Sequence, residues 1–505
     1  MKFSFVKLLS LLLAMLMLLS LASCATGETP NVDTEAGESG STTDAVTEGE
    51  TQDLSYVCEL PEGLNYDTEI YYLYTEGYAR DDELVSEELG GGVISDAVYE
   101  RNLAVENRLG VELYFSSKGS DVEMAATIAN LVQGNDDSVD IFVIGTYYAM
   151  TPVLAGHYLN LNQVENVDLT KLYWNQHYNE MMTFTDADLQ FVATSPTALS
   201  IFRMGYLTIF NRDLFKDYKI ADLYEAVENG EWTLEYQYNI IKDVYVDSNG
   251  DSKKNSGDFF GFVVGAVTDM DVYAVSSDIH LAVRNEDGDM VYNTDAFDRL
   301  VDMSEKVSAL CNAAGTYLAD SFSEGFQVPI KQFAAKKTLM ATTMFDDVET
   351  EFEQLADMNY GIAPLPKLNQ AQPEYGTYIQ DQVSSFGISA AVGDESRQAI
   401  LGAVMEAMSY HSYEIVRPAY YDSVLSLRFM QDPQSRAILD TMFESISFDY
   451  VYATSLGGIR DSLRSVISSS NPAVASNAKQ WERQVQSALR SQQKSLDKLL
   501  EQHQQ

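Results

Sequence analysis

Hydrophobic and polar positions in the first part of the chain follow a regular order of strand-like and helix-like segments. Alternating apolar and polar residues are typical of a strand, and apolar residues three or four positions apart are typical of a helix. These patterns predict strands at 69–74, 111–115 and 139–145, separated by helices at 95–109 and 121–133. Strands that alternate with helices predict a parallel, doubly wound α/β sheet. Ligands of such sheets bind beyond the carboxyl ends of the strands, which here carry residues 76–78 and 145–148.

The rest of the chain continues with the same two kinds of pattern. Strand-like segments occur at 189–193, 206–210, 259–267, 339–342 and 385–389, and helical ones at 232–246, at 295–310 and from 395 to the end. Thr233 is the expected N-cap of its helix, because its hydroxyl can accept a hydrogen bond from the first turn. About 450 residues follow the N-terminal region, which is enough for two or more cores.

The N-terminal residues have the pattern of a secretory signal peptide, which we place at residues 1–23. A short basic start precedes an apolar run over 8–19, which is too short to span a membrane. Leu21-Ala22-Ser23-Cys24 resembles a bacterial lipobox, so we expect lipid, including palmitate, on Cys24. The alternative is ordinary cleavage nearby, with Cys24 incidental. Residues 24–53 are polar and acidic, which predicts a disordered linker between the lipid anchor and the globular part.

The charge of the chain restricts its partners. The formal net charge is −44, from 32 Lys and Arg against 76 Asp and Glu. Nucleic acid is excluded as a partner, because its binding depends on Lys and Arg that neutralise phosphates. Only Cys58 and Cys311 remain besides Cys24. They could form a disulfide or stay as two unpaired thiols, and their spacing leaves both possibilities open.

The polar segment 247–258 has the spacing of a twelve-residue calcium loop. Oxygen ligands stand at the required loop positions, with one of them supplied by a backbone carbonyl. The predicted ligands are Asp247, Asn249, Asp251, Lys253 through its carbonyl, Asn255 and Asp258. The loop resembles those of dockerins, although Ser252 replaces the usual glycine and Asp258 a bidentate glutamate. We expect a structural Ca²⁺ site of modest affinity, and the alternative is a polar connection without metal.

Four segments carry a resemblance to a known family. The segment Tyr206–Phe215 resembles the strand followed by Asn-Lys-Asp-Leu-Phe of bacterial extracellular solute-binding proteins, the carbohydrate-type lipoproteins of ABC importers, with Arg212 in place of the lysine. Residues 229–233 resemble the Gly-x-Trp-Thr helix entry of that family, 361–367 its Gly-x-x-Pro-x-Pro turn, and 417–422 a segment of its clostridial-type branch. The four segments occur in the order of that family, and the resemblance covers nearly the whole mature chain.

The resemblance implies an α/β fold of the periplasmic-binding-protein type, class II, in which two lobes close on a ligand like a clamshell. Lobe 1 would take residues 54–208 and 341–385, and lobe 2 would take 211–337 and 387–505. Hinge strands would cross between the lobes near 208–211, 338–341 and 385–387. Closure of two lobes around a ligand is a common hinge motion.

The resemblance also implies a function and a set of partners. The chain would be a monomeric receptor, anchored to the cell membrane on its extracellular or periplasmic side. It would bind a small solute, an oligosaccharide above all, and deliver it to the permease subunits of an ABC transporter. No organic cofactor is expected.

Candidate ligand residues lie in or after segments that end at the expected cleft. Sugars stack on aromatic rings, and their hydroxyls bond to Asp, Asn and Arg. On this basis we select Tyr147, Tyr148, Trp174, Arg203, Phe345 and Asp346. For each of these residues, packing in the core is the competing interpretation.

Motifs of common catalytic sites do not occur in the chain. There is no Gly-x-Ser-x-Gly, His-Glu-x-x-His, Walker loop or Cys-x-x-Cys, and the five histidines are scattered. We therefore expect a protein that is not an enzyme. The alternatives are a surface glycoside hydrolase, whose carboxylate spacing a sequence does not reveal, and a lipoprotein that captures polysaccharide without transport.

Overall fold

The computed structural model describes residues 54–503, except 87, 185–188, 287 and 427–432. The predicted signal peptide, Cys24 and the linker lie outside the described residues. Among the described helices, none is both long and apolar enough to cross a membrane.

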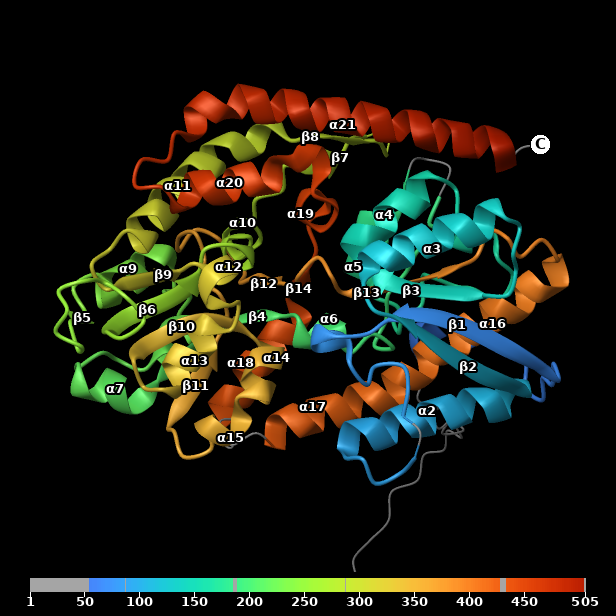
Figure 1. Ribbon diagram of the computed structural model, residues 1–505, viewed down its shortest axis with the longest axis horizontal. Coiled ribbons are helices and arrows are strands. Elements are labelled where there is room, and N and C mark those ends of the chain that lie inside the picture. Colours follow the sequence, from blue (N-terminus) through green and yellow to red (C-terminus); the bar gives the residue numbers. More distant parts are fainter. Residues whose placement is uncertain (1–53, 87, 185–188, 287, 427–432, 504–505) are drawn as a thin grey trace, which may run out of the picture. The chain divides into compact units, whose positions relative to one another are not determined.

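The first sheet contains the three strands predicted from the N-terminal pattern (Figure 1). Its order is β13-β3-β1-β2, with β1 (Thr68–Thr75) parallel to both β2 (Val111–Lys118) and β3 (Ile141–Gly145). Helices α2 (Val93–Leu109) and α3 (Asp121–Gln133) connect these strands. The prediction of a parallel α/β sheet is therefore confirmed. The N-cap of α3 is Ser120, whose hydroxyl accepts a hydrogen bond from the backbone of Glu123.

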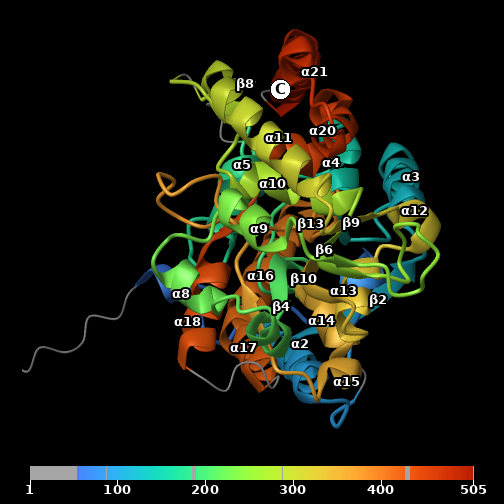
Figure 2. The same ribbon diagram turned by 90° about the vertical axis from the view of Figure 1, so that its left-hand side faces the viewer.

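The second sheet contains parallel and antiparallel strands and is built from residues between 206 and 363 (Figures 1 and 2). Its order is β11-β4-β10-β6-β5, and β9 also pairs with β6. The strands are β4 (Tyr206–Asn211), β5 (Tyr245–Val246), β6 (Phe259–Gly265), β9 (Thr316–Ala319), β10 (Thr338–Met344) and β11 (Tyr360–Ala363). Because β6, β9 and β10 are parallel, their carboxyl ends lie at one edge of this sheet.

Strand pairing corrects the predicted boundary between the lobes. Strands β10 and β11 both pair with β4, so residues 341–363 belong to the second sheet and not to lobe 1 as predicted. The chain returns to the first sheet only at β13 (Ser384–Ile388), which pairs antiparallel with β3. Helix α16 (Glu395–His411) then packs on α2 beside the first sheet, although 387–505 was assigned to lobe 2. The hydrophobic pattern identifies a buried strand but not the sheet that it joins.

Two predicted elements differ from the structure in length or kind. Residues 189–193 form only isolated bridges, from Leu189 to Phe184 and from Ala193 to Phe386, instead of a strand. The helix expected over 232–246 is α9 (Leu234–Ile241), after which the chain turns into the short strand β5. Thr233 caps this helix as predicted, accepting a hydrogen bond from the backbone of Tyr236.

The C-terminal helix α21 (Val474–His503) contacts elements of both halves. Figure 1 shows it lying along α11 (Phe297–Cys311) at one end and reaching α4 (Thr146–Leu154) at the other. Its Trp481 is buried, and Leu499 lies so close to Gly156, just after α4, that a Cβ there would be 2.5 Å from the leucine methyl. Helix α21 therefore packs on the lobe of the second sheet and on that of the first.

Candidate functional site

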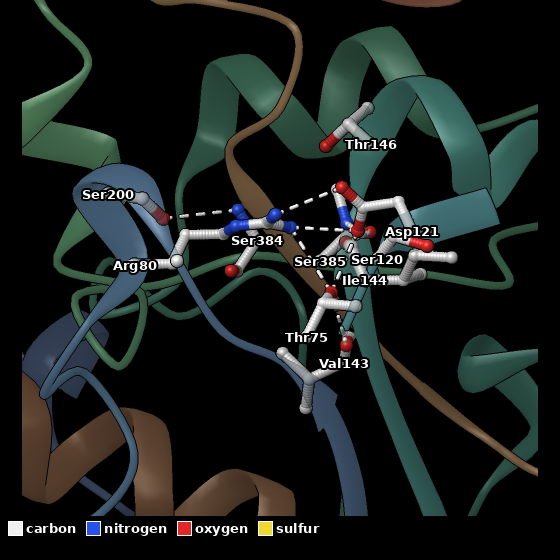
Figure 3. A network of polar contacts seen from close by, with 12 residues as sticks. Thr75, Arg80, Ser120, Asp121, Val143, Ile144, Thr146, Ser200, Ser384 and Ser385 are labelled. Carbon is white, nitrogen blue, oxygen red and sulfur yellow. Dashed lines mark hydrogen bonds and ion pairs between the residues drawn. The ribbon is translucent and has the colours of Figure 1, made fainter. Parts of the chain in front are cut away.

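A buried ion pair holds together the strand ends of the first sheet (Figure 3). Arg80 donates to both carboxylate oxygens of Asp121, at 2.8 and 2.9 Å. Asp121 also accepts from the Thr75 hydroxyl at 2.7 Å and from the Gly145 backbone at 3.0 Å, and both of these residues end a strand. Burial alone would raise the pKa of Asp121, but the Arg80 guanidinium and the other donors lower it. This network fixes the edge of the first sheet at which a ligand would bind.

Tyr78 extends from this edge toward the second sheet. It follows β1 and has a φ of 57°, a left-handed conformation that is uncommon for a bulky residue. Its hydroxyl lies 3.6 Å from the sulfur of Met344, the last residue of β10. Tyr78 is 40% exposed, so its ring remains partly accessible between the two sheets.

A cavity of about 430 Å³ opens beside Tyr78. It is lined by residues from the turn after β1, from α6 (Ser200–Arg203), from the start of α13 (Val328–Ala334) and from α14 (Phe345–Thr350). These residues are Tyr78, Asp81, Asp82, Arg203, Gln327, Asp346, Glu349 and Thr350, and we call the space that they line the cleft cavity. The cavity is therefore lined by residues that follow strands of both sheets, which is where ligands of α/β sheets bind.

Among the described residues, Arg203 is the one cationic side chain that lines the cleft cavity. It is 8% exposed and donates to the carbonyl of Asp81 at 2.5 Å. Its Nε lies 3.5 Å from Glu349. Burial raises the pKa values of Glu349 and Asp346, and the charge of Arg203 opposes both shifts.

Behind the cavity, two further carboxylates are buried at the strand ends of the second sheet. Asp269 and Asp347 are 6% and 5% exposed. Burial raises the pKa of Asp269 to about 7 and that of Asp347 to about 6, and the charge of Asp347 contributes to the first shift and that of Asp346 to the second. Asp269 accepts a hydrogen bond from the Gly265 backbone at 2.7 Å, and Asp347 accepts one from the Thr343 hydroxyl at 2.8 Å.

A second group of charged side chains lies near the start of α4. Arg460 pairs with Asp381, and Arg464 pairs with Asp271. The guanidinium of Arg460 also lies over the ring of Tyr147, 5.0 Å from its centroid. Burial raises the pKa of Asp271 to about 6, while the bonds to Arg464 oppose that shift. Unlike Asp269 and Asp347, these carboxylates have cationic partners among the described residues.

The six residues selected from the sequence reach different surroundings. Arg203 and Asp346 lie together on the wall of the cleft cavity. Tyr147 lies against Arg460, and its ring meets that of Tyr148 edge-on at 4.8 Å. Phe345 is buried beside Phe443, and Trp174 is buried with its indole nitrogen 3.1 Å from Glu406. The latter two therefore pack in the core in this structure.

Sequence reasoning did not select Tyr78, Asp81 or Glu349. Tyr78 lies at the predicted carboxyl end of the first strand. Its position there, together with its aromatic ring, could have identified it as a ligand residue. Asp81 and Glu349 are brought together by Arg203, a contact between segments more than 100 residues apart.

The predicted calcium loop is closed by its own hydrogen bonds. Asp247 accepts from the backbone of Gly250 and Ser252, and Asp251 accepts from Lys253. Asp258 is fully buried and accepts from the Tyr245 hydroxyl at 3.1 Å. Within the described residues, no three His, Cys, Asp or Glu side chains gather as a metal site. The predicted ligands share one loop, but their carboxylates bind backbone and tyrosine donors.

Another cavity, of about 490 Å³, lies away from the strand ends. It is lined by the ends of α5 (Gln176–Met182) and α10 (Val272–Ser276) and by nearby loops, including His177, His280 and Glu444. It is larger than the cleft cavity, but the strands of the first and second sheets do not line it.

No protein-family model matches the chain, and no curated protein matches it in sequence. Solved structures match its fold. A sugar transporter from Rhizobium etli in an open conformation matches with a TM-score of 0.55 at 12% identity, over 83% of this chain and 98% of that one. An ABC substrate-binding protein from Listeria monocytogenes in complex with cycloalternan matches with 0.52 at 12% identity, over 85% and 99%.

The maltose/maltodextrin-binding domain from Bdellovibrio bacteriovorus, bound to maltotriose, matches with a TM-score of 0.51 at 13% identity, over 84% of this chain and all of that one. The chain therefore has the two-lobe α/β fold of ABC sugar-binding proteins, and the predicted fold class is confirmed. Identity this low establishes the fold alone.

Proposed function

We propose that this chain is an extracellular receptor that binds a carbohydrate in the cleft cavity and delivers it to an ABC transporter. One observation carries the proposal: the cavity lies where the strand-end edges of the two sheets meet, and both edges supply polar side chains to it. Proteins of the same fold include one bound to maltotriose and one in complex with cycloalternan. The receptor would release its ligand unchanged and would not be an enzyme.

The lining of the cavity suits the two surfaces of a sugar. The ring of Tyr78 offers a face for C–H groups, while Arg203, Asp346 and Asp81 offer a donor and acceptors for hydroxyls. Because the side chains come from both sheets, a bound sugar would bridge the lobes and favour their closed arrangement. A permease that recognises that arrangement would then take up only the loaded receptor.

The N-terminal region completes the proposal. Lipid on Cys24 would hold the receptor at the outer face of the cell membrane or on its periplasmic side. The linker 24–53 would let the globular part reach the permease while anchored.

A thermal-shift screen of the purified protein against mono- and oligosaccharides and short peptides tests the ligand class. A ligand that binds the native state raises the melting temperature by mass action. We expect a rise with at least one saccharide and no release of reducing ends from it. A rise with peptides alone would contradict the carbohydrate assignment, and release of reducing ends would instead identify a glycoside hydrolase.

We also propose that residues 247–258 bind a structural Ca²⁺ ion. The support is the spacing of the oxygen ligands together with a loop whose side chains already point at its own backbone. Calcium would replace these internal donors and connect β5 to β6 more firmly. The melting temperature should rise with millimolar calcium, and Asp251→Ala should abolish that rise; a melting temperature indifferent to calcium would refute the site.

A further inference from the structure

The cleft cavity carries a surplus of negative charge. Within the part of the chain that the structure describes, four carboxylates line it, Asp81, Asp82, Asp346 and Glu349, against the single guanidinium of Arg203. Arg203 is already engaged by Glu349 and by the Asp81 carbonyl. Among the described residues, no cationic side chain forms an ion pair with the carboxylates of Asp81, Asp82 or Asp346. Asp346 is also only partly exposed to solvent.

The buried carboxylates behind the cavity add to this surplus. Asp347 is 5% exposed, and none of the described residues gives a hydrogen bond to its Oδ1. Burial raises the pKa of Tyr78, whose ring lines the cavity, and the charges of Asp347, Asp269 and Asp346 raise that pKa further. A buried negative charge without a cationic partner is costly, so a positive charge brought by a ligand into the adjoining cavity would be favourable.

The arrangement of these acids indicates what kind of cation would fit. A metal ion requires several carboxylates to converge on one point, and within the described residues the acids that line the cleft cavity do not gather in that way. The acids are instead spread around a space of about 430 Å³, which accommodates an organic molecule. Opposite charges attract strongly in such a half-buried site, and a carboxylate on the ligand would be repelled.

We infer that the ligand of the cleft cavity is an amino sugar or an amino-sugar oligosaccharide, whose ammonium group lies among Asp81, Asp82 and Asp346. This inference rests on the proposed carbohydrate function and makes it more specific. The ammonium group supplies both the charge and the donors that the cavity lacks, while the sugar hydroxyls bond to Arg203 and Gln327. Neutral and uronic acid forms of the same sugar bind less tightly.

The test uses matched sets of saccharides that differ only in one substituent. Each scaffold is offered as the free amine, the N-acetyl form, the neutral hydroxyl form and the uronate, and its affinity is measured by calorimetric titration at pH 7. For any scaffold that binds, we expect the free amine to bind at least ten times more tightly than the other forms. Its affinity should also fall as salt is added.

Two variants with the same change in charge locate the effect. Asp346→Asn removes a carboxylate from the cleft cavity and should reduce the preference for the amine to less than threefold. Asp137→Asn removes an exposed carboxylate after α3 and should leave the preference intact.

The outcomes separate this inference from the proposed function. If neutral or N-acetyl forms bind as tightly as the amines, the inference is wrong and the carbohydrate receptor stands. If no saccharide binds but spermidine does, the carbohydrate function fails and the cavity takes a cation of another class, which also overturns the amino-sugar assignment. If Asp137→Asn acts as strongly as Asp346→Asn, the attraction comes from the whole chain and not from this cavity, and the inference fails.

Discussion

Each sheet buries carboxylates at its strand ends, but within the described residues Arg80 neutralises Asp121 at the first sheet and no cation pairs with Asp269 or Asp347 at the second. Asp121, beside the ends of β1 and β3, has Arg80 and two further donors, and its pKa is lowered. Asp269 and Asp347, at the ends of β6 and β10, have no cationic partner among the described residues, and their pKa values are raised to about 7 and about 6.

This difference separates a structural use of charge from a functional one. A paired carboxylate fixes the backbone around it, as Asp121 does for Thr75 and Gly145. An unpaired buried carboxylate destabilises the fold and persists where something else compensates for it. At the second sheet the cleft cavity lies next to these carboxylates, so a ligand can provide that compensation. Three predictions test this contrast.

The largest effect is expected from breaking the pair of the first sheet. Asp121→Asn leaves the Arg80 guanidinium buried without its counter-charge, and this should lower the free energy of unfolding by about 3–5 kcal/mol. Urea denaturation measures the loss. The control is Asp302→Asn, which breaks the partly exposed pair with Lys306 on α11 and should cost less than about 0.5 kcal/mol. Equal losses for the two variants would mean that Arg80 and Asp121 do not hold the sheet edge.

Removing a carboxylate from the second sheet should raise the free energy of unfolding, whereas removing Asp121 from the first sheet should lower it. Asp269 faces Asp347, Tyr206, Tyr78 and Tyr273, none of which is cationic. Because its folded-state pKa lies above the unfolded value, the folded protein holds a proton that the unfolded chain releases between about pH 4 and about pH 7. The stability contributed by this proton is complete below that window and is lost as the pH rises through it.

Asp269→Asn should therefore stabilise the protein at pH 8, by up to about 4 kcal/mol, and change little at pH 4. Urea denaturation at both pH values measures the difference. A variant that is less stable than the wild type at pH 8 would contradict the assignment of Asp269 as an uncompensated acid.

The smallest of the three effects concerns the aromatic side chain that joins the two edges. Tyr78→Ala removes a ring that lines the cleft cavity, and it should weaken saccharide binding about tenfold, or about 1.4 kcal/mol, with little change in melting temperature. Calorimetric titration measures the affinity. Tyr114→Ala, a matched loss of an exposed ring on β2, should leave binding unchanged. If the two variants bind alike, Tyr78 does not contact the ligand.

The sequence predicted local elements well because their patterns are local. Helix α3 and strand β3 begin and end within two residues of the prediction, since one has a capped, periodic sequence and the other is a continuous apolar run. The lobe to which β10 and β11 belong was not predictable in this way, because both sheets bury strands of the same composition.

The candidate site was predicted only in part for a similar reason. Arg203 and Asp346 were selected because they follow predicted segments, and they do line one cavity. Trp174 was selected for its aromatic ring, but Glu406 accepts its indole hydrogen in the core of the first lobe. A sequence does not show that a distant glutamate on α16 provides a buried partner for this indole.

The most direct measurement is a calorimetric titration of the saccharide found by the screen into three proteins: the wild type, Asp346→Ala and His177→Ala. Asp346 lines the cleft cavity, and His177 lines the larger cavity away from the strand ends. We expect Asp346→Ala to weaken binding at least tenfold and His177→Ala to bind like the wild type. Weakened binding in His177→Ala together with unchanged binding in Asp346→Ala would contradict the assignment of the ligand to the cleft cavity, because the ligand would then occupy the other cavity.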